Sequence, residues 1–206
     1  MIKNIIFDMG HVLIYFDRER YLNRHAKDCT PEERTLLLRE IYLSADWIMQ
    51  DRGTRTPAQT VKTVCERLPE HLHRAAEGLV CRWYEDITPV PGMADLVGEL
   101  KAKGYGIYLL SNASCRQPDY WQRVPAARFF DGTLISYSVK LVKPMPEIYE
   151  KFFEKFSLKR EECFFIDDSP ANIEASLYVG MPGAVFHNDI HRLRRELRAA
   201  GVDVEA

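Results

Sequence analysis

The residues of this sequence that could do chemistry stand where short apolar runs end in polar side chains. Carboxylates, a hydroxyl and an amine are the groups that serve as nucleophiles, metal ligands, hydrogen-bond donors and point charges in active sites. The residues concerned are Asp8, Ser111, Asn112, Lys143, Asp167 and Asp168. Each alone has an ordinary explanation as part of a turn, a helix start or a solvated loop. Their occurrence as an ordered set favours a common site.

The apolar runs before these residues predict buried β-strands. The runs cover residues 2–7, 105–110, 163–166 and 182–186. Helical periodicity lies between them, over residues 93–103, 144–156 and 171–178. Strands that alternate with helices predict an α/β fold with a parallel sheet, and ligands bind such a sheet at the carboxyl ends of its strands. We therefore expect Asp8, Ser111 and the Asp167–Asp168 pair to converge.

Residues 17–88 depart from this alternation because they carry helix signals and no convincing strand. Thr30-Pro31 and Thr56-Pro57 both read as helix starts with a capping residue followed by proline. The turn formers of residues 88–92 then predict an interdomain linker. The sequence thus predicts a core of residues 1–16 and 89–206, with a helical domain of residues 17–88 inserted into it.

Composition gives no sign of a macromolecular partner. The 206 residues include 28 Lys and Arg against 30 Asp and Glu, a net charge of −2, which provides no global attraction to nucleic acid or an anionic membrane. The five scattered cysteines form no metal or redox motif, and no apolar run is long enough for a signal peptide or a membrane span. The arginine-rich residues 191–198 predict a solvated amphipathic helix. We expect a cytoplasmic protein that is a monomer or a weak homodimer.

Four segments together resemble the motifs of the haloacid dehalogenase superfamily. The resemblance covers essentially the whole chain. Within the superfamily, the sequence is most similar to the branch with a helical cap, which includes phosphatases that act on sugar phosphates. It implies a doubly wound, Rossmann-like parallel-sheet core with an inserted α-helical cap. The segments are Asp8-Met9-Gly10-His11-Val12, Ser111, Lys143-Pro144 and Asp167-Asp168.

The resemblance implies a Mg²⁺-dependent phosphatase of a small phosphorylated metabolite. Asp8 would attack phosphorus and form an aspartyl-phosphate. Ser111, Lys143 and main-chain amides near Asn112 would hold the phosphoryl group. The expected Mg²⁺ ligands are Asp8, the main-chain carbonyl of Gly10, Asp168 and, directly or through a hydrogen bond, Asp167.

Gly10 is a departure from the family pattern, which has an aspartate there as general acid and base. General acid–base catalysis contributes about 10²–10⁴ in rate, so we expect a slow enzyme or one selective for good leaving groups, such as sugar 1-phosphates or acyl phosphates. His11 is a candidate substitute acid. Packing of His11 beneath the cap is the more favoured expectation, because neighbouring residues of an extended segment point in opposite directions.

Two rival functions remain open. A 2-haloacid dehalogenase would use the same aspartate without a metal, although no arginine in the sequence stands out as a halide ligand. A domain that only binds a phosphorylated ligand or a protein partner would explain Gly10 without catalysis. Side chains of the cap region could line a substrate pocket, although aromatic residues more often belong to a core. These candidates are Tyr15, Phe16, Trp47 and Gln50.

Overall fold

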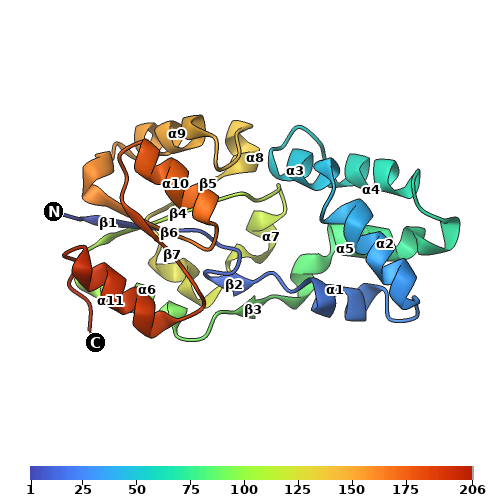
Figure 1. Cartoon of the computed structure of the whole chain (residues 1–206), viewed down its shortest axis with the longest axis horizontal. Coiled ribbons are helices and arrows are strands. Elements are labelled where there is room, and N and C mark those ends of the chain that lie inside the picture. Colours follow the sequence, from blue (N-terminus) through green and yellow to red (C-terminus); the bar gives the residue numbers. More distant parts are fainter. Residues whose placement is uncertain (206) are drawn as a thin grey trace.

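The computed structural model describes residues 1–205 and shows a parallel sheet on one side and a group of helices on the other (Figure 1). The sheet has five strands in the order β5-β4-β1-β6-β7, all parallel. This arrangement confirms the predicted α/β fold. The strands are β1 (Asn4–Phe7), β4 (Gly106–Ser111), β5 (Gly132–Ile135), β6 (Cys163–Asp167) and β7 (Gly183–Val185).

Strand β1 lies at the centre of the sheet and is buried on both faces. Ile5 pairs in register with Ile107 of β4 and with Phe164 of β6. One face is packed by helices α6 and α11 and the other by α9 and α10, as Figure 1 shows. Continuous apolar runs are what a parallel sheet covered on both faces requires, which is why these strands could be predicted from the sequence.

The helices follow the predicted periodic segments closely where those segments belong to the core. The predicted starts and ends differ from the observed ones by at most two residues. The core helices are α6 (Met93–Ala102), α7 (Gln117–Trp121), α8 (Ser136–Val139), α9 (Pro146–Phe156), α10 (Pro170–Tyr178) and α11 (Ile190–Ala199).

Between β2 (Ile14–Tyr15) and β3 (Thr88–Pro89) the chain forms five α-helices, and we call residues 17–88 the helical insertion. Both predicted capping boxes are present: Thr30 caps with Glu33, and Thr56 with Gln59. The helices are α1 (Arg18–His25), α2 (Pro31–Ile41), α3 (Ala45–Asp51), α4 (Pro57–Cys65) and α5 (His73–Cys81).

Residues 88–92, predicted as an interdomain linker made of turn formers, begin with a short strand. Thr88 pairs with Tyr15 and Pro89 with Ile14, so β2 and β3 form an antiparallel ribbon that joins the insertion to the core. Pro89 has no N–H to donate. It is tolerated because each strand of a two-stranded ribbon is an edge strand, where one hydrogen-bonding side is free of a partner strand. Strand β5 was also missed, because this edge strand is short and only Leu134 is fully buried.

Among the described residues, no helix combines the length and the apolar character needed to cross a membrane.

Candidate active site

Asp8 lies at the end of the central strand, where the order of the sheet brings polar residues of three strands together. Strands β4 and β6 flank β1, so Ser111 at the end of β4 and Asp167 at the end of β6 lie on either side of it. The main-chain N–H of Asp8 donates to the carbonyl of Ile166 over 2.8 Å, which continues the ladder to the site. Asp8 is 8% exposed as a whole residue and borders a cavity.

The ammonium group of Lys143 joins the two buried carboxylates of the site. Its Nζ lies 2.7 Å from Oδ1 of Asp8 and 2.6 Å from Oδ2 of Asp167. A third hydrogen bond, of 2.9 Å, goes to the carbonyl of Leu110. All three donors of the ammonium are therefore used, and the charge on Lys143 offsets the repulsion between the two acids.

Asn112 fixes the main chain that carries Lys143. The Asn112 side chain accepts a 2.8 Å hydrogen bond from the Lys143 N–H and donates one of 3.0 Å to the Lys143 carbonyl. Sequence reasoning suggested that Asn112 contacts substrate. Its side-chain amide positions Lys143, and the residue borders the cavity, so contact of its main chain with substrate stays a prediction.

Asp167 and Asp168, at the end of β6 and directly after it, differ in how many hydrogen bonds they accept from protein groups. Asp167 is fully buried and accepts hydrogen bonds from the Ser169 N–H at 2.8 Å and from Asn172 Nδ2 at 3.0 Å to each oxygen, in addition to that from Lys143. Asp168 is partly exposed and borders the cavity. This leaves Asp168 better placed than Asp167 to offer an oxygen to a cation.

The acidic cluster has the composition and spacing of a divalent-cation site. Ligand oxygens of Asp8, Asp167 and Asp168 lie within 4.8 Å of one another. Carboxylate oxygens are the ligands that Mg²⁺ prefers. Gly10 borders the same cavity and offers only main-chain atoms, of which the carbonyl is a suitable further ligand.

Burial shapes the protonation of this cluster. It raises the pKa of Asp8 to about 6, against the opposing effect of Lys143 and with a further increase from the charge of Asp167. The pKa of Asp168 is also raised, by burial and then by neighbouring Asp167. Burial would lower the pKa of Lys143, but the charges of Asp167 and Asp8 outweigh it and hold that pKa above its usual value. Lys143 is therefore a permanent cation at neutral pH.

The cavity beside Asp8 has a volume of about 230 Å³ and lies between the core and the helical insertion. Side chains of both parts form its wall. His11 lies there with a φ of 55°, and it is exposed rather than packed beneath the insertion, so that expectation is wrong. The residues that line it include Asp8, Gly10, Arg18, Trp47, Asp51, Trp83, Ser111 and Asp168.

The helical insertion contributes both expected and unexpected residues to the cavity. Phe16, just before the insertion, and Trp47 within it line the cavity as proposed. Gln50 is fully buried and does not border it, and the Tyr15 hydroxyl instead donates to Asn188 over 2.8 Å. Sequence reasoning missed Arg18, Asp51 and Trp83. Single charged residues of an insertion carry no pattern in the sequence, so no signal marked the first two.

Comparisons with known proteins identify the family of the chain. The model of the haloacid dehalogenase-like hydrolase family matches residues 2–180. The sesquiterpene phosphatase astK of Aspergillus oryzae is 31% identical over 187 residues, which cover 88% of this chain and 88% of the relative. Flavin mononucleotide hydrolase 1 of Arabidopsis thaliana is 26% identical over 113 residues, or 55% of this chain, and the match spans only 46% of that relative.

A solved structure provides the matching fold with ligands bound. It is the wild-type HAD family enzyme bt-2542 from Bacteroides thetaiotaomicron, in complex with magnesium and inorganic phosphate. The two chains are 26% identical, with a TM-score of 0.72, and the match covers 94% of this chain and 99% of the other.

Proposed function

The chain belongs to the haloacid dehalogenase-like hydrolase family, and we propose that it is a magnesium-dependent phosphatase of a small phosphorylated molecule. The observation that carries the proposal is the grouping of Asp8, Asp167 and Asp168 beside a cavity, with the ammonium group of Lys143 bonded to the first two of these acids. A carboxylate nucleophile, a cation site and a fixed positive charge are the groups that phosphoryl transfer requires. Support comes from the similar enzyme whose structure holds magnesium and phosphate.

In this proposal Asp8 attacks phosphorus and becomes phosphorylated, and a water molecule then hydrolyses the aspartyl-phosphate. Ser111 and Lys143 hold the oxygens of the transferring group, and the main chain near Asn112 supplies further donors. Asp8, Asp168 and the Gly10 carbonyl would hold the magnesium ion, with Asp167 supporting them. The bound ion would neutralise charge on the phosphate oxygens.

The helical insertion would act as a cap over a core of residues 1–16 and 89–206. Figure 1 shows the β2–β3 ribbon as the connection between the two parts. Trp47 and Trp83 of the insertion line the cavity together with the catalytic groups, so this part of the chain would select the leaving group of the substrate. The missing carboxylate at Gly10 would restrict the enzyme to good leaving groups, such as those of sugar 1-phosphates or acyl phosphates, unless another side chain supplies the proton.

A panel of phosphorylated metabolites, assayed with magnesium and with a chelator, tests this proposal. The panel should include sugar 1-phosphates, sugar 5- and 6-phosphates, acyl phosphates and flavin mononucleotide. We expect phosphate release from at least one compound, and its loss on chelation. Turnover of no phosphorylated compound, or turnover that is indifferent to chelation, would contradict the proposal.

A dehalogenase is the second candidate function, and one observation favours it. Arg18 is the only arginine among the described residues that line the cavity, and a guanidinium is a suitable partner for a departing halide or a substrate carboxylate. The chain is also 25% identical over 189 residues to an (S)-2-haloacid dehalogenase of Pseudomonas sp. (strain YL). Incubation with 2-haloacids in the presence of a chelator decides between the two: halide release would favour the dehalogenase and would exclude a requirement for magnesium.

A further inference from the structure

We propose that Asp51, carried by helix α3 of the helical insertion, donates the proton to the leaving oxygen of the substrate in place of the carboxylate that Gly10 lacks. The inference rests on the proposed phosphatase function and assigns a catalytic residue to it. It follows from where the Asp51 side chain lies, from the contacts that hold it there and from its protonation.

Asp51 and the proposed nucleophile Asp8 border one cavity, and the charge of Asp8 acts on Asp51. Both Asp51 and Asp8 line the same space of about 230 Å³, the one from the insertion and the other from the core. A substrate whose phosphorus is next to Asp8 must direct its leaving group away from that carboxylate, because attack and departure are in line. The leaving group would therefore enter the part of the cavity that the insertion lines.

The main chain around Asp51 is fastened directly to the core. The hydroxyl of Ser136, which is fully buried, donates to the Asp51 carbonyl over 2.6 Å and accepts from the Ala113 N–H over 2.9 Å. Ala113 follows the Ser111-Asn112 pair, so one hydroxyl ties the end of α3 to the loop that is proposed to hold phosphate. Arg52 adds a 2.9 Å hydrogen bond from its Nε to the Lys140 carbonyl.

Gly53 permits this close approach. Its φ is +73°, and a Cβ there would lie 2.6 Å from the main-chain oxygen of Tyr137. Glycine is the residue that adopts such a φ without strain and leaves room for a neighbouring backbone. The position of Asp51 over the site is therefore specified by several contacts that span the two parts of the chain.

The surroundings of Asp51 favour the protonated form that a donor needs. Burial raises its pKa well above the usual value for an aspartate, and the charge of Asp8 raises it further, against a smaller effect of its hydrogen bond with the Trp47 side chain. A protonated carboxyl group can donate a proton, whereas an ionised one cannot. Asp168, the other acid bordering the cavity that could serve, belongs to the proposed cation site, and His11 lies exposed beside it.

In the proposed reaction, Asp51 gives up its proton in the first step and recovers one in the second. As Asp8 attacks phosphorus and the bond to the leaving oxygen breaks, Asp51 transfers its proton to that oxygen and the alcohol departs, leaving Asp51 ionised. The Asp51 carboxylate then accepts a proton from the water that attacks the phosphorus of the aspartyl-phosphate. The bond between phosphorus and Asp8 breaks, inorganic phosphate forms, and Asp51 is again protonated.

The test is the dependence of kcat/KM on the leaving group, measured with magnesium on p-nitrophenyl phosphate and on alkyl phosphates. For the natural enzyme we expect a weak dependence, because a proton donor assists poor leaving groups. For Asp51→Asn we expect a loss of about 10²–10⁴-fold on alkyl phosphates and little loss on p-nitrophenyl phosphate, whose phenolate needs no proton. Asparagine retains the shape of the side chain and can still accept from Trp47.

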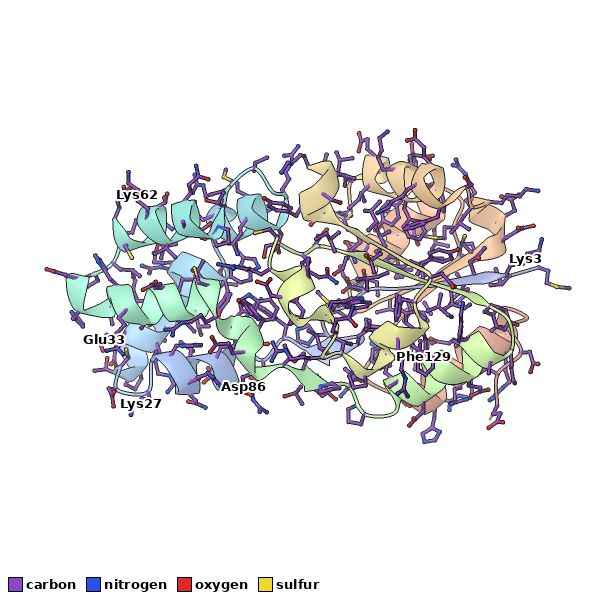
Figure 2. The ribbon with its side chains drawn as sticks, turned by 180° about the vertical axis from the view of Figure 1, so that it is seen from behind. Lys3, Lys27, Glu33, Lys62, Asp86 and Phe129 are labelled. Carbon is purple, nitrogen blue, oxygen red and sulfur yellow. The ribbon has the colours of Figure 1, made fainter. Side chains whose placement is uncertain are left out.

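The control and a rescue variant follow from the structure. Asp28→Asn is the control, because it makes the same chemical change at an exposed position of the insertion. Figure 2 shows the neighbouring Lys27 at the end of the molecule far from Lys3 and the core. The leaving-group profile of Asp28→Asn should match that of the natural enzyme. Gly10→Asp restores a carboxylate where a Cβ would meet only Asp8 Oδ2, at 3.9 Å. Added to Asp51→Asn, it should recover the activity on alkyl phosphates.

The outcomes separate this inference from the proposed function. An equal loss on all leaving groups in Asp51→Asn, or no loss on alkyl phosphates, would overturn the role of Asp51 while the phosphatase stands. A steep leaving-group dependence in the natural enzyme would overturn it without any variant. Absence of phosphatase activity in the natural enzyme, by contrast, would remove the proposed function itself.

Discussion

Lys143 donates a 2.7 Å hydrogen bond to Asp8, although the two residues are 135 positions apart in the chain. The pair is almost completely buried, and the same ammonium also bonds to Asp167. A buried charge without its partner is costly, so this pair links the stability of the fold to the chemistry of the site.

Replacement of Lys143 by methionine should therefore destabilise the protein. Methionine retains much of the volume but leaves Asp8 and Asp167 without a cation, and loss of one partner from a buried ion pair costs about 3–5 kcal/mol. Urea denaturation without magnesium measures the change in the free energy of unfolding. Magnesium should stabilise the variant more than the natural protein, because the ion replaces part of the lost charge. An unchanged free energy of unfolding would show that Lys143 is not the counter-ion.

Replacement of Asp8 by asparagine should abolish turnover and stabilise the metal-free protein at neutral pH. Because burial raises the pKa of Asp8 from 3.8 to about 6, the folded state holds this proton more tightly than the unfolded chain does. The stability that Asp8 contributes is thus fully present below pH 3.8 and lost as the pH rises through about 6. The variant should have a higher Tm than the natural protein above pH 6 and the same Tm near pH 3.5. Each kcal/mol gained in the free energy of unfolding should raise the Tm by about 2–4 °C.

The opposite trend, a variant whose advantage grows as the pH falls, would contradict the raised pKa. Turnover that survives in Asp8→Asn would exclude Asp8 as the nucleophile. A domain that only binds a ligand or partner would have no activity to lose.

Replacement of Gly53 by alanine should lower kcat/KM by moving the insertion away from the core. The new Cβ would clash with the main chain of Tyr137, and the positive φ adds strain. Gly104→Ala is the matched control, because Gly104 has a φ of +88° and open space around its missing Cβ. Both variants should lose stability, and only Gly53→Ala should lose activity. Equal activity in the two variants would show that the close contact at Gly53 does not position the site.

Replacement of Arg18 by alanine should raise KM and leave kcat for the cleaved bond largely unchanged. Arg18 is exposed at the cavity and stacks near the rings of Phe16 and Tyr42, at 5.9 Å from each centroid. From there it can contact an anionic or oxygen-rich part of the substrate, and we place it outside the groups that act on phosphorus. Steady-state kinetics on the best substrate of the panel measure both constants, and a loss confined to kcat would argue against this assignment.

Much of the core could be predicted because its strands are specified by short, local patterns in the sequence. Asp8 and Asp167 each end a run of buried apolar residues, and parallel strands place such ends on the same edge of the sheet. Ser111 followed from the same rule. The match to the family model confirmed the predicted superfamily, whose motif residues all belong to the core.

The insertion could be predicted as helical, but its part of the site could not. The capping residues Thr30 and Thr56 mark helix starts in the sequence itself, whereas the direction of Asp51 depends on how a whole group of helices docks on the core. That docking is set by single contacts, such as the bond from Ser136 to the Asp51 carbonyl, that leave no periodic pattern. The same reason explains why Arg18 was missed and why Gln50, a candidate, proved to be buried away from the cavity.

The most direct test of the central claim is to find the phosphoryl group on Asp8. The protein is mixed with magnesium and its best phosphorylated substrate, quenched in acid during turnover and digested for mass spectrometry. We expect the mass of one phosphoryl group on the peptide that contains Asp8, and its absence from Asp8→Asn. Continued turnover with no phosphorylated peptide, or with the phosphoryl group on another residue, would contradict the account.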